Sequence, residues 1–335
     1  MRTTAVVLLL VTLAAGCDRP SIEGEGPQKM RVSTEISSDQ SVPLAERLDA
    51  AKHDLRTHLE ESGLARVAGD LQRLMMVSIR LKAKVTAEDD LKPGSSKLGG
   101  TPDLPDGTAW PECNGVPMAL LAQLRMQDVA PCDPDGRLPK SGMLYFFYET
   151  KDQKWGFDPE DRGHWKVIYY DGDLAGFRAA TPPNAWPKES RFRACRLTFF
   201  NEITLPSWDS KDIERLRLSR AERDGYAAFP GTSCGEGEIV HRLLGHPEQI
   251  QGDMQLECQL ASNGIYCGNP EGYADPRRAT LESGATDWRL LLQIDSDEDN
   301  MGAMWGDTGR VYFWIREQEL KKRDFSNVWL VLECY

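Results

Sequence analysis

The stretch Gly142-Met-Leu-Tyr-Phe-Phe147 decides the fold, because it recurs as Gly309-Arg-Val-Tyr-Phe-Trp314 in the second half of the chain. Each is a glycine followed by aromatic and aliphatic residues, which is typical of a buried β-strand. Three further pairs keep the same order along the chain: Gly100-Thr-Pro102 with Gly245-His-Pro247, Leu121-Ala-Gln-Leu124 with Leu291-Leu-Gln-Ile294, and Val167-Ile-Tyr-Tyr170 with Val331-Leu-Glu-Cys334. Chance similarity between Tyr- and Phe-rich strands is the alternative. We predict an α+β fold with an internally duplicated, antiparallel-rich sheet unit, its pseudo-repeats at about residues 92–175 and 240–335.

Helices are expected before the first repeat. Apolar residues fall at helical spacing in two series, Leu44, Leu48, Ala51, Leu55 and Leu59, and then Val67, Leu71, Leu74, Leu81 and Val85 with Ser78 between them. The turn Ser62-Gly63 separates the series, so residues 43–91 are predicted to form a helical pair that packs on its own domain, or alternatively a partner-binding coiled coil. Residues 209–224 are predicted to form one more helix.

The N-terminus has the pattern of an export signal. Arg2 precedes an apolar run that is about half the ~20 residues needed to cross a bilayer, and this run ends at Gly16-Cys17. Leu13-Ala-Ala-Gly-Cys17 resembles the lipobox of bacterial lipoproteins, although Ala14 stands where that motif usually has Leu. The resemblance implies a signal peptide at residues 1–16, lipidation of Cys17 and a lipid-anchored flexible tether at residues 17–42. A cleaved secreted protein and an uncleaved anchor are the alternatives to a lipoprotein of the bacterial cell envelope, in its inner or outer membrane.

The charge balance constrains the partners. Lys and Arg number 40 against 52 Asp and Glu, a net charge of −12, and removal of residues 1–16 would take away Arg2 and leave 39 − 52 = −13. Nucleic-acid binding is therefore disfavoured, because it needs a basic surface, and attachment to the membrane is expected through the lipid anchor only. An acidic surface favours a basic protein partner by electrostatic steering.

The cysteines give no strong metal or redox motif. Eight are present, without any Cys-x-x-Cys spacing, and loss of Cys17 to lipidation would leave an odd number. Cys258 and Cys267 are spaced so that they could close a local disulfide loop.

The acidic segment from Asp295 to Asp307 is the candidate ligand or cation site. Asp295, Asp297 and Asp299 alternate as the first ligands of a calcium loop do, and Asp307 could add a further oxygen. The segment is not an EF-hand, because Asn300 stands at the sixth position and Gly306 at the twelfth. Trp305 could supply an aromatic platform for a ligand, or be buried in the core. A solvated turn is the alternative to a calcium site.

Gly231-Thr-Ser-Cys-Gly235 matches the nucleophile-elbow pattern of esterases. Pro230 precedes it, and the only later histidines, His241 and His246, follow too closely for the usual catalytic triad. A turn is therefore predicted instead of a hydrolase site, and no catalytic residue is assigned.

Several blocks also resemble the YwqG-like family, a bacterial domain of unknown function. They are Ser96-Lys-Leu-Gly-Gly-Thr-Pro-Asp-Leu-Pro105, His241-Arg-Leu-Leu-Gly-His-Pro247, Gln251-Gly-Asp-Met254, Met304-Trp-Gly-Asp307 and Arg323-Asp-Phe-Ser326. The resemblance covers about residues 92–335, implies an α+β fold with internal duplication, and brings no established catalytic residues. Families of this kind that are encoded near secreted toxins suggest an immunity-like or accessory role. We therefore expect an envelope lipoprotein with a non-catalytic protein-binding domain; the alternative is a small-ligand or cation-binding protein or an enzyme that uses Asp295 to Asp307.

Serine- and cysteine-directed activity probes are expected not to label Ser233 or Cys234 in the folded protein, because the neighbouring sequence does not supply the acid and base that activate a nucleophile. Mass spectrometry of the probe-treated protein checks this. Stoichiometric labelling of either residue would establish a nucleophile.

Overall fold

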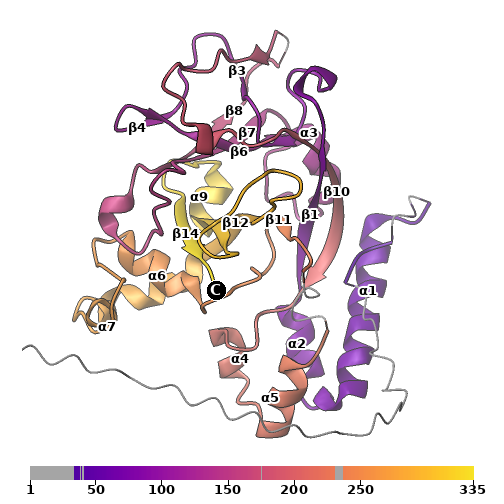
Figure 1. Ribbon diagram of the computed structural model, residues 1–335. Coiled ribbons are helices and arrows are strands. Elements are labelled where there is room, and N and C mark those ends of the chain that lie inside the picture. The colour runs from indigo at the N-terminus through magenta and orange to yellow at the C-terminus, as the bar shows by residue number, and fades with distance from the viewer. Residues whose placement is uncertain (1–33, 38, 40, 175, 231–236) are drawn as a thin grey trace, which may run out of the picture. The chain divides into compact units, whose positions relative to one another are not determined.

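Both Tyr-Phe stretches are strands of one ten-stranded antiparallel sheet, β7 (Met143–Tyr148) and β13 (Arg310–Arg316). The computed structural model describes residues 34–37, 39, 41–174, 176–230 and 237–335, so the expected signal peptide, Cys17 and Gly231 to Gly235 lie outside the described residues. The strand order is β14-β13-β12-β11-β1-β10-β2-β6-β7-β8 (Figure 1). The sheet is thus symmetric about its two central strands, with one predicted repeat on each side.

The bounds of the strands show this symmetry. The first repeat supplies β2 (Lys97–Leu98), β6 (Ala119–Arg125), β7 and β8 (Trp165–Tyr170). The second supplies β11 (His241–Leu243), β12 (Trp288–Asp295), β13 and β14 (Trp329–Glu333). The central strands β1 (Met76–Val85) and β10 (Cys195–Thr204) pair along their whole length.

The duplication is confirmed at the level of single hydrogen bonds. Gln123 in β6 binds the Asp103 backbone N–H through its side-chain oxygen at 2.7 Å and the Ser95 carbonyl through its side-chain nitrogen at 2.9 Å. Its counterpart Gln293 binds the Glu248 N–H at 2.8 Å and the Val240 carbonyl at 2.9 Å. A register shift also falls at the same place in both repeats, between Leu120 and Ala122 and between Leu290 and Leu292. Such agreement at buried polar groups excludes chance similarity of strand composition.

One detail of the predicted alignment is wrong. Phe146 lies opposite Val167, and its counterpart Phe313 lies opposite Leu330. Val167 therefore corresponds to Leu330 and not to Val331. Both strands are apolar throughout, so composition alone could not distinguish registers that differ by one residue.

The glycines that begin the repeated motif permit close backbone approach. A Cβ atom on Gly142 would lie 2.3 Å from the Tyr170 carbonyl oxygen, and one on Gly309 would lie 2.2 Å from that of Glu333. Any larger residue would push the neighbouring strand away.

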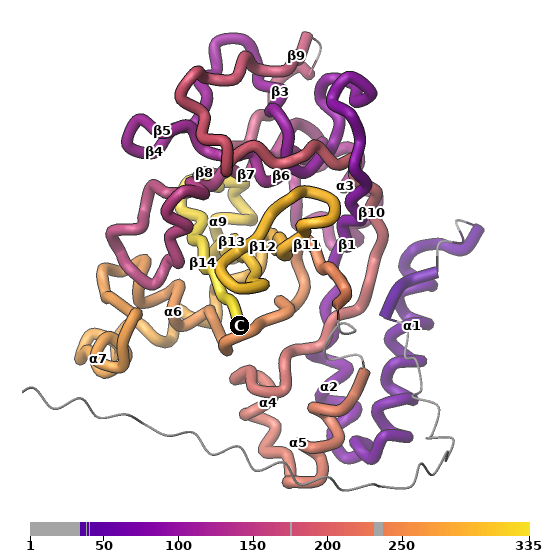
Figure 2. Tube along the Cα trace, viewed as in Figure 1, coloured from indigo at the N-terminus to yellow at the C-terminus, as the bar shows by residue number. Residues whose placement is uncertain are grey.

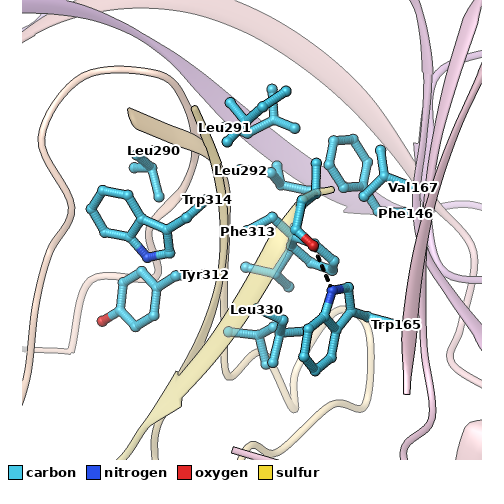
Figure 3. Packing of buried hydrophobic residues seen from close by; sticks show 14 of the residues in the cluster. Phe146, Trp165, Val167, Leu290, Leu291, Leu292, Tyr312, Phe313, Trp314 and Leu330 are labelled. Carbon is cyan, nitrogen blue, oxygen red and sulfur yellow. Dashed lines mark hydrogen bonds between the residues drawn. The ribbon is translucent and has the colours of Figure 1, made fainter. Parts of the chain in front are cut away.

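The two ends of the sheet meet and nearly close a barrel. The Trp165 indole donates to the Val328 carbonyl at 2.8 Å (Figure 3). The Trp165 ring also packs edge-on against Trp329, with ring centroids 5.1 Å apart. In the core, the ring of Phe146 from the first repeat packs edge-on against the ring of Phe313 from the second, with ring centroids 5.1 Å apart. Tyr312 and Trp314 lie on the other side of β13 from Phe313 (Figure 3), and all three are buried in the same apolar cluster.

The helices at the N-terminus depart from the prediction. α1 (Leu44–Leu59) is followed by a single π-helical turn (Glu60–Leu64), and α2 (Ala68–Leu74) has 7 residues, well short of the series from Val67 to Val85 that predicts it. Residues 76–85, predicted to be helical, form β1. Apolar residues in this segment also alternate, with Ile79 and Leu81 buried on one face, and pairing with β10 selects the extended conformation.

Two other expectations are corrected. Residues 209–224 form no single helix, because α4 (Lys211–Arg215) ends before Arg217, whose φ is 49°, and α5 (Arg220–Ala227) begins with its own Ser219 capping box. The expected tether also ends before residue 42. The Ile36 N–H donates to the Asn201 carbonyl at 2.9 Å and the Ile36 side chain is buried, so this part of the chain adds to the edge of β10.

The remaining elements cover the outside of the sheet. The short strands β3 (Asp103–Leu104), β4 (Glu112–Cys113), β5 (Val116–Pro117) and β9 (Arg178–Ala179) gather as a cap over β6 to β8 (Figure 2). The corresponding insertion in the second repeat is helical, with α6 (Met254–Ala261), α7 (Pro270–Tyr273) and α8 (Arg278–Leu281). Two small helices follow strands of the sheet, α3 (Met126–Val129) and α9 (Glu317–Lys322).

Neither a disulfide nor a membrane span is found in the described part of the chain. Cys258 and Cys267 are both free and buried, so the suggested loop closure is not formed. None of the helices in these described ranges has the length and apolar character needed to cross a bilayer.

Gln293→Leu is expected to destabilise the protein, because it removes the side-chain hydrogen bonds to the half-buried Glu248 N–H and to the buried Val240 carbonyl, and orphaning a buried carbonyl costs about 1–3 kcal/mol. Urea unfolding at equilibrium measures the change. Gln249→Leu, which removes a single exposed amide bond to Asp209, is the matched control and should alter the free energy of unfolding little. Equal losses in the two variants would contradict the structural role of Gln293.

Candidate functional site

The predicted carboxylate cluster does not converge on a ligand. The Asp295 carboxylate lies 3.1 Å from Arg310 Nε and accepts the Val240 N–H at 2.9 Å. Asp297 is fully buried and accepts hydrogen bonds from the backbone N–H and the side-chain amide of Asn300, each at 2.9 Å. The oxygens of both residues are therefore engaged in holding the loop after β12.

His241 completes this arrangement from β11. The Asp295 backbone N–H donates to His241 Nδ1 at 3.1 Å, so the imidazole carries its proton on Nε2, which lies 3.2 Å from Asp297 Oδ2. Burial raises the pKa of Asp297, but the hydrogen bonds from His241 and Asn300 outweigh it and leave that pKa below its ordinary value. A neutral histidine and an ionised aspartate are thus locked together in the core.

The other candidates are divided between core and surface. Trp305 is fully buried, donates from Nε1 to the Asp295 carbonyl at 3.1 Å, and packs against Tyr148 and Phe192. Asp299 and Asp307 are exposed. In the described ranges no group of three or more His, Cys, Asp or Glu side chains is placed to hold a metal ion. The expected calcium ligands are therefore not assembled there.

The same loop joint occurs in the first repeat. The Arg125 backbone N–H donates to Ser96 Oγ at 2.9 Å, where the second repeat has the Asp295 N–H and His241 Nδ1. Ser96 also donates to Asp128 at 2.8 Å, as His241 does to Asp297. The His241 and Asp297 pair therefore occupies the place of a structural contact in the other repeat.

A cleft of about 700 Å³ lies elsewhere, on the outside of the second repeat. It is bounded by the end of α2, the segment between β10 and α4, the Gly245-His246-Pro247 turn, the start of α6 and the segment before β12. Its volume is within the range of about 300–1,000 Å³ that is typical of ligand pockets.

Charges of both signs line the cleft, and several are already paired. Arg215 binds Asp212 at 2.8 Å, and Arg289 binds Glu317 at 3.0 Å. The cleft also contains Arg73 and Lys211 as cations and Asp253 and Glu282 as anions. A mixed lining of this kind suits a ligand with little net charge.

Two tryptophans of the sheet lie in the cleft. Trp288 donates from Nε1 to the Gln259 side-chain oxygen at 2.9 Å. Trp314 is only 3% exposed, and its Nε1 has no hydrogen-bond acceptor in the described part of the protein. Trp208 stands between the lining residues Ser207 and Ser210 and is 57% exposed. Trp288 and Trp314 thus form part of the cleft wall with their indole nitrogens buried, and an exposed indole lies in the segment that lines the cleft.

The comparison with protein families agrees with this architecture. Residues 96–334, which span both repeats, match the model of a family described as a domain of unknown function (DUF1963). The chain belongs to the DUF1963 family. No curated protein matches the sequence. The family match is consistent with the YwqG-like resemblance, and the cleft lies within the matched region.

Sequence reasoning missed the cleft of this DUF1963 domain, although one signal pointed there. The blocks Gly245-His-Pro247 and Gln251-Gly-Asp-Met254 resemble the YwqG-like family, and Gly245, His246 and Asp253 line the cleft. Trp314 was identified as the end of a strand motif, but its position over an open space depends on how the helical insertion folds.

His246 is held neutral at the cleft. Its Nε2 donates to the Leu74 carbonyl at 2.8 Å. Loss of solvation lowers the pKa of His246 to about 4, although this hydrogen bond and nearby Asp212 oppose the shift. The ring therefore acts as an uncharged link between α2 and the Gly245-His246-Pro247 turn.

His246 is expected to contribute a loss of stability as the pH falls from about 6.5, the ordinary value for histidine, toward 4, because the unfolded chain binds a proton that the folded His246 refuses. His246→Gln keeps a donor for Leu74 without titrating, so on going from pH 7 to pH 5 this variant should lose less stability, or gain more, than the unmodified protein. Thermal melts across this range measure it. Glu257 and Glu333, whose pKa values burial raises to about 7, have the opposite effect but are present in both proteins. Parallel curves for the two proteins would contradict the assignment.

Proposed function

We propose that this DUF1963 protein is a lipoprotein of the bacterial cell envelope, anchored through Cys17, whose domain binds a protein partner without turnover. The observation that carries the proposal is the cleft with the exposed Trp208 in its lining segment and with Trp288 and Trp314 in its wall. An exposed tryptophan beside a concave, partly apolar surface is typical of the residues that contribute most to protein binding.

The cleft supports recognition rather than chemistry. His246 is the histidine of the cleft, and it is a poor general base because its pKa is lowered. Its ring N–H is already bound to the Leu74 carbonyl. Asp253, an acid of the cleft wall, accepts the Gln255 N–H at 3.2 Å and caps α6. Both residues contribute to the scaffold of the cleft.

The N-terminal sequence supports the proposed attachment to the envelope. The lipobox-like segment ending at Cys17 and the polar residues after it would hold the domain at a membrane surface. An immunity-like or accessory role agrees with this placement. A basic partner is favoured by the overall charge of −12, whereas the cleft itself carries charges of both signs.

The alternative function at Asp295 to Asp307 has less support. Asp295 is paired with Arg310, Asp297 is held by hydrogen bonds from His241 and Asn300, and Trp305 is buried among aromatic rings. A ligand there would have to displace contacts that hold the loop.

A photo-crosslinking residue in place of Trp208 is expected to capture a protein partner in native membranes, whereas the same residue in place of Tyr266 should not. Tyr266 is also exposed, at 43%, and is not part of the cleft lining. Quantitative mass spectrometry identifies the captured proteins. Trp208→Ala should reduce recovery of the partner about tenfold, as loss of one dominant contact does. Equal capture from both positions, or from neither, would count against this face.

A further inference from the structure

One charge of the cleft is not balanced. The wall carries four cationic side chains against three anionic ones: Arg73, Lys211, Arg215 and Arg289, and Asp212, Asp253 and Glu282. His246 is held neutral and adds no charge. The cleft wall is therefore positive by one charge, in a protein whose net charge is −12.

The arginines of the wall are paired with carboxylates. Arg73, Arg215 and Arg289 have acidic partners in Asp70, Asp212 and Glu317, respectively. Each of these guanidinium groups is thus compensated by a neighbouring group of the protein.

The acids of the wall are engaged as well. Asp212 is the partner of Arg215, and Glu282 pairs with Arg278 at 3.1 Å. Asp253 accepts the backbone N–H of Gln255 at 3.2 Å and that of Lys211 at 3.4 Å. All three carboxylates are therefore bound to groups of the described protein.

Lys211 is the exception among these charged side chains. Its backbone N–H is bound to Asp253, but its Nζ has no hydrogen-bond or ion-pair partner among the residues that the structure describes. The residue is half-buried at the start of α4, so a molecule that enters the cleft would remove more water from its ammonium group. An anion carried by that molecule would offset the loss of hydration.

A carboxylate fits the surroundings of Lys211. Ser210, the preceding residue, accepts the Ile213 N–H through its hydroxyl oxygen at 3.4 Å, which leaves the hydroxyl proton available to donate. The wall also contains the apolar side chains of Leu256 and Leu290. A carboxylate carried on methylene carbons, as in Asp and Glu, can contact both kinds of surface.

Trp208 connects this charge with a protein partner. It is 57% exposed and stands three residues before Lys211, in the segment that lines the cleft. A partner that covers Trp208 would also exclude water near Lys211, and a charge interaction strengthens as water is excluded. The overall negative charge favours a basic partner, whereas one acidic residue opposite Lys211 would fix the orientation of that partner.

We propose that Lys211 forms an ion pair with an Asp or Glu side chain of the protein partner, within the cleft, and that this pair fixes the orientation in which the partner docks. This inference rests on the proposed function and names the group of the partner that is recognised. Lys211 is then a specificity-determining residue of the cleft.

The test uses the full chain in native membranes, with the photo-crosslinking residue at position 208 and, in a second step, a carbodiimide, which joins an amine to a carboxylate when the two are in contact. We expect mass spectrometry to identify an amide bond between Lys211 and an Asp or Glu of the captured partner. Lys211→Arg keeps the charge, but a guanidinium stays protonated and does not form this bond. This variant should retain capture and lose the amide product.

Lys211→Glu reverses the charge and should lower recovery of the partner at least tenfold, because like charges then face each other. Lys188→Glu is the matched control. Lys188 is also the first residue of a short helix (Lys188–Ser190), is exposed, and is not part of the cleft lining. Both changes lower the net charge by two, so any effect of total charge is the same, and the control should recover as much partner as the unmodified protein.

The outcomes separate this inference from the proposed function. Capture that Lys211→Glu leaves unchanged, or that yields no amide at Lys211, would overturn the inference and leave the proposed function intact. Equal losses in Lys211→Glu and Lys188→Glu would also overturn it, because total charge would then explain the effect. No capture from position 208 in the otherwise unmodified protein would contradict the proposed function, and the inference with it. Melting curves of all variants and retained capture by Lys211→Arg exclude unfolding as the cause of a loss.

Discussion

The pairing of β1 with β10 is the contact on which the rest of the protein depends. It runs from Met76 opposite Thr204 to Val85 opposite Cys195, and it is the only strand pairing in the described sheet that joins the two symmetric halves. Without it each half would expose a long unpaired strand edge, which is a surface prone to aggregation. On the barrel side, Ile79, Leu81 and Leu197 are buried in the main core.

The other face of this seam contains buried charges. The Glu202 carboxylate lies 3.1 Å from Arg80 Nη1 and 3.0 Å from Arg242 Nε, and it accepts the Ser78 hydroxyl at 2.8 Å. Burial raises the pKa of Glu202, but the two arginines outweigh it, so that pKa lies below its ordinary value. Removing one member of such a group typically costs about 3–5 kcal/mol, because the remaining charges stay buried. Charge pairing thus connects β1, β10 and β11, the strands where the repeats meet.

Duplication gives this protein two copies of one backbone plan with different coverings. The buried glutamines, the bulges and the joints after β6 and β12 are the same in both copies. The copies diverge where the chain leaves the sheet, after Pro102 and Pro247. An apolar cap over Phe147 stabilises the first copy, whereas the helical insertion beside Trp314 leaves a cleft. Function in such a fold is expected where the copies differ, because the shared contacts are needed for folding in both.

Sequence alone determined the α+β class, the duplication and the strands β7, β8 and β13, because dense Tyr and Phe runs behind glycines occur in matching order. The helix α1 was predicted for the same kind of reason, since its apolar residues repeat at a helical period. Tertiary structure decided that residues 76–85 form a strand, because their apolar residues fit both periods and only pairing with β10 distinguishes them. It also gave Asp295 and Asp297 a structural role through Arg310 and His241, which lie near them only after the sheet has formed. The cleft beside Trp314 was equally beyond the sequence, because an open space and an unsatisfied donor depend on how segments distant in the chain pack around them.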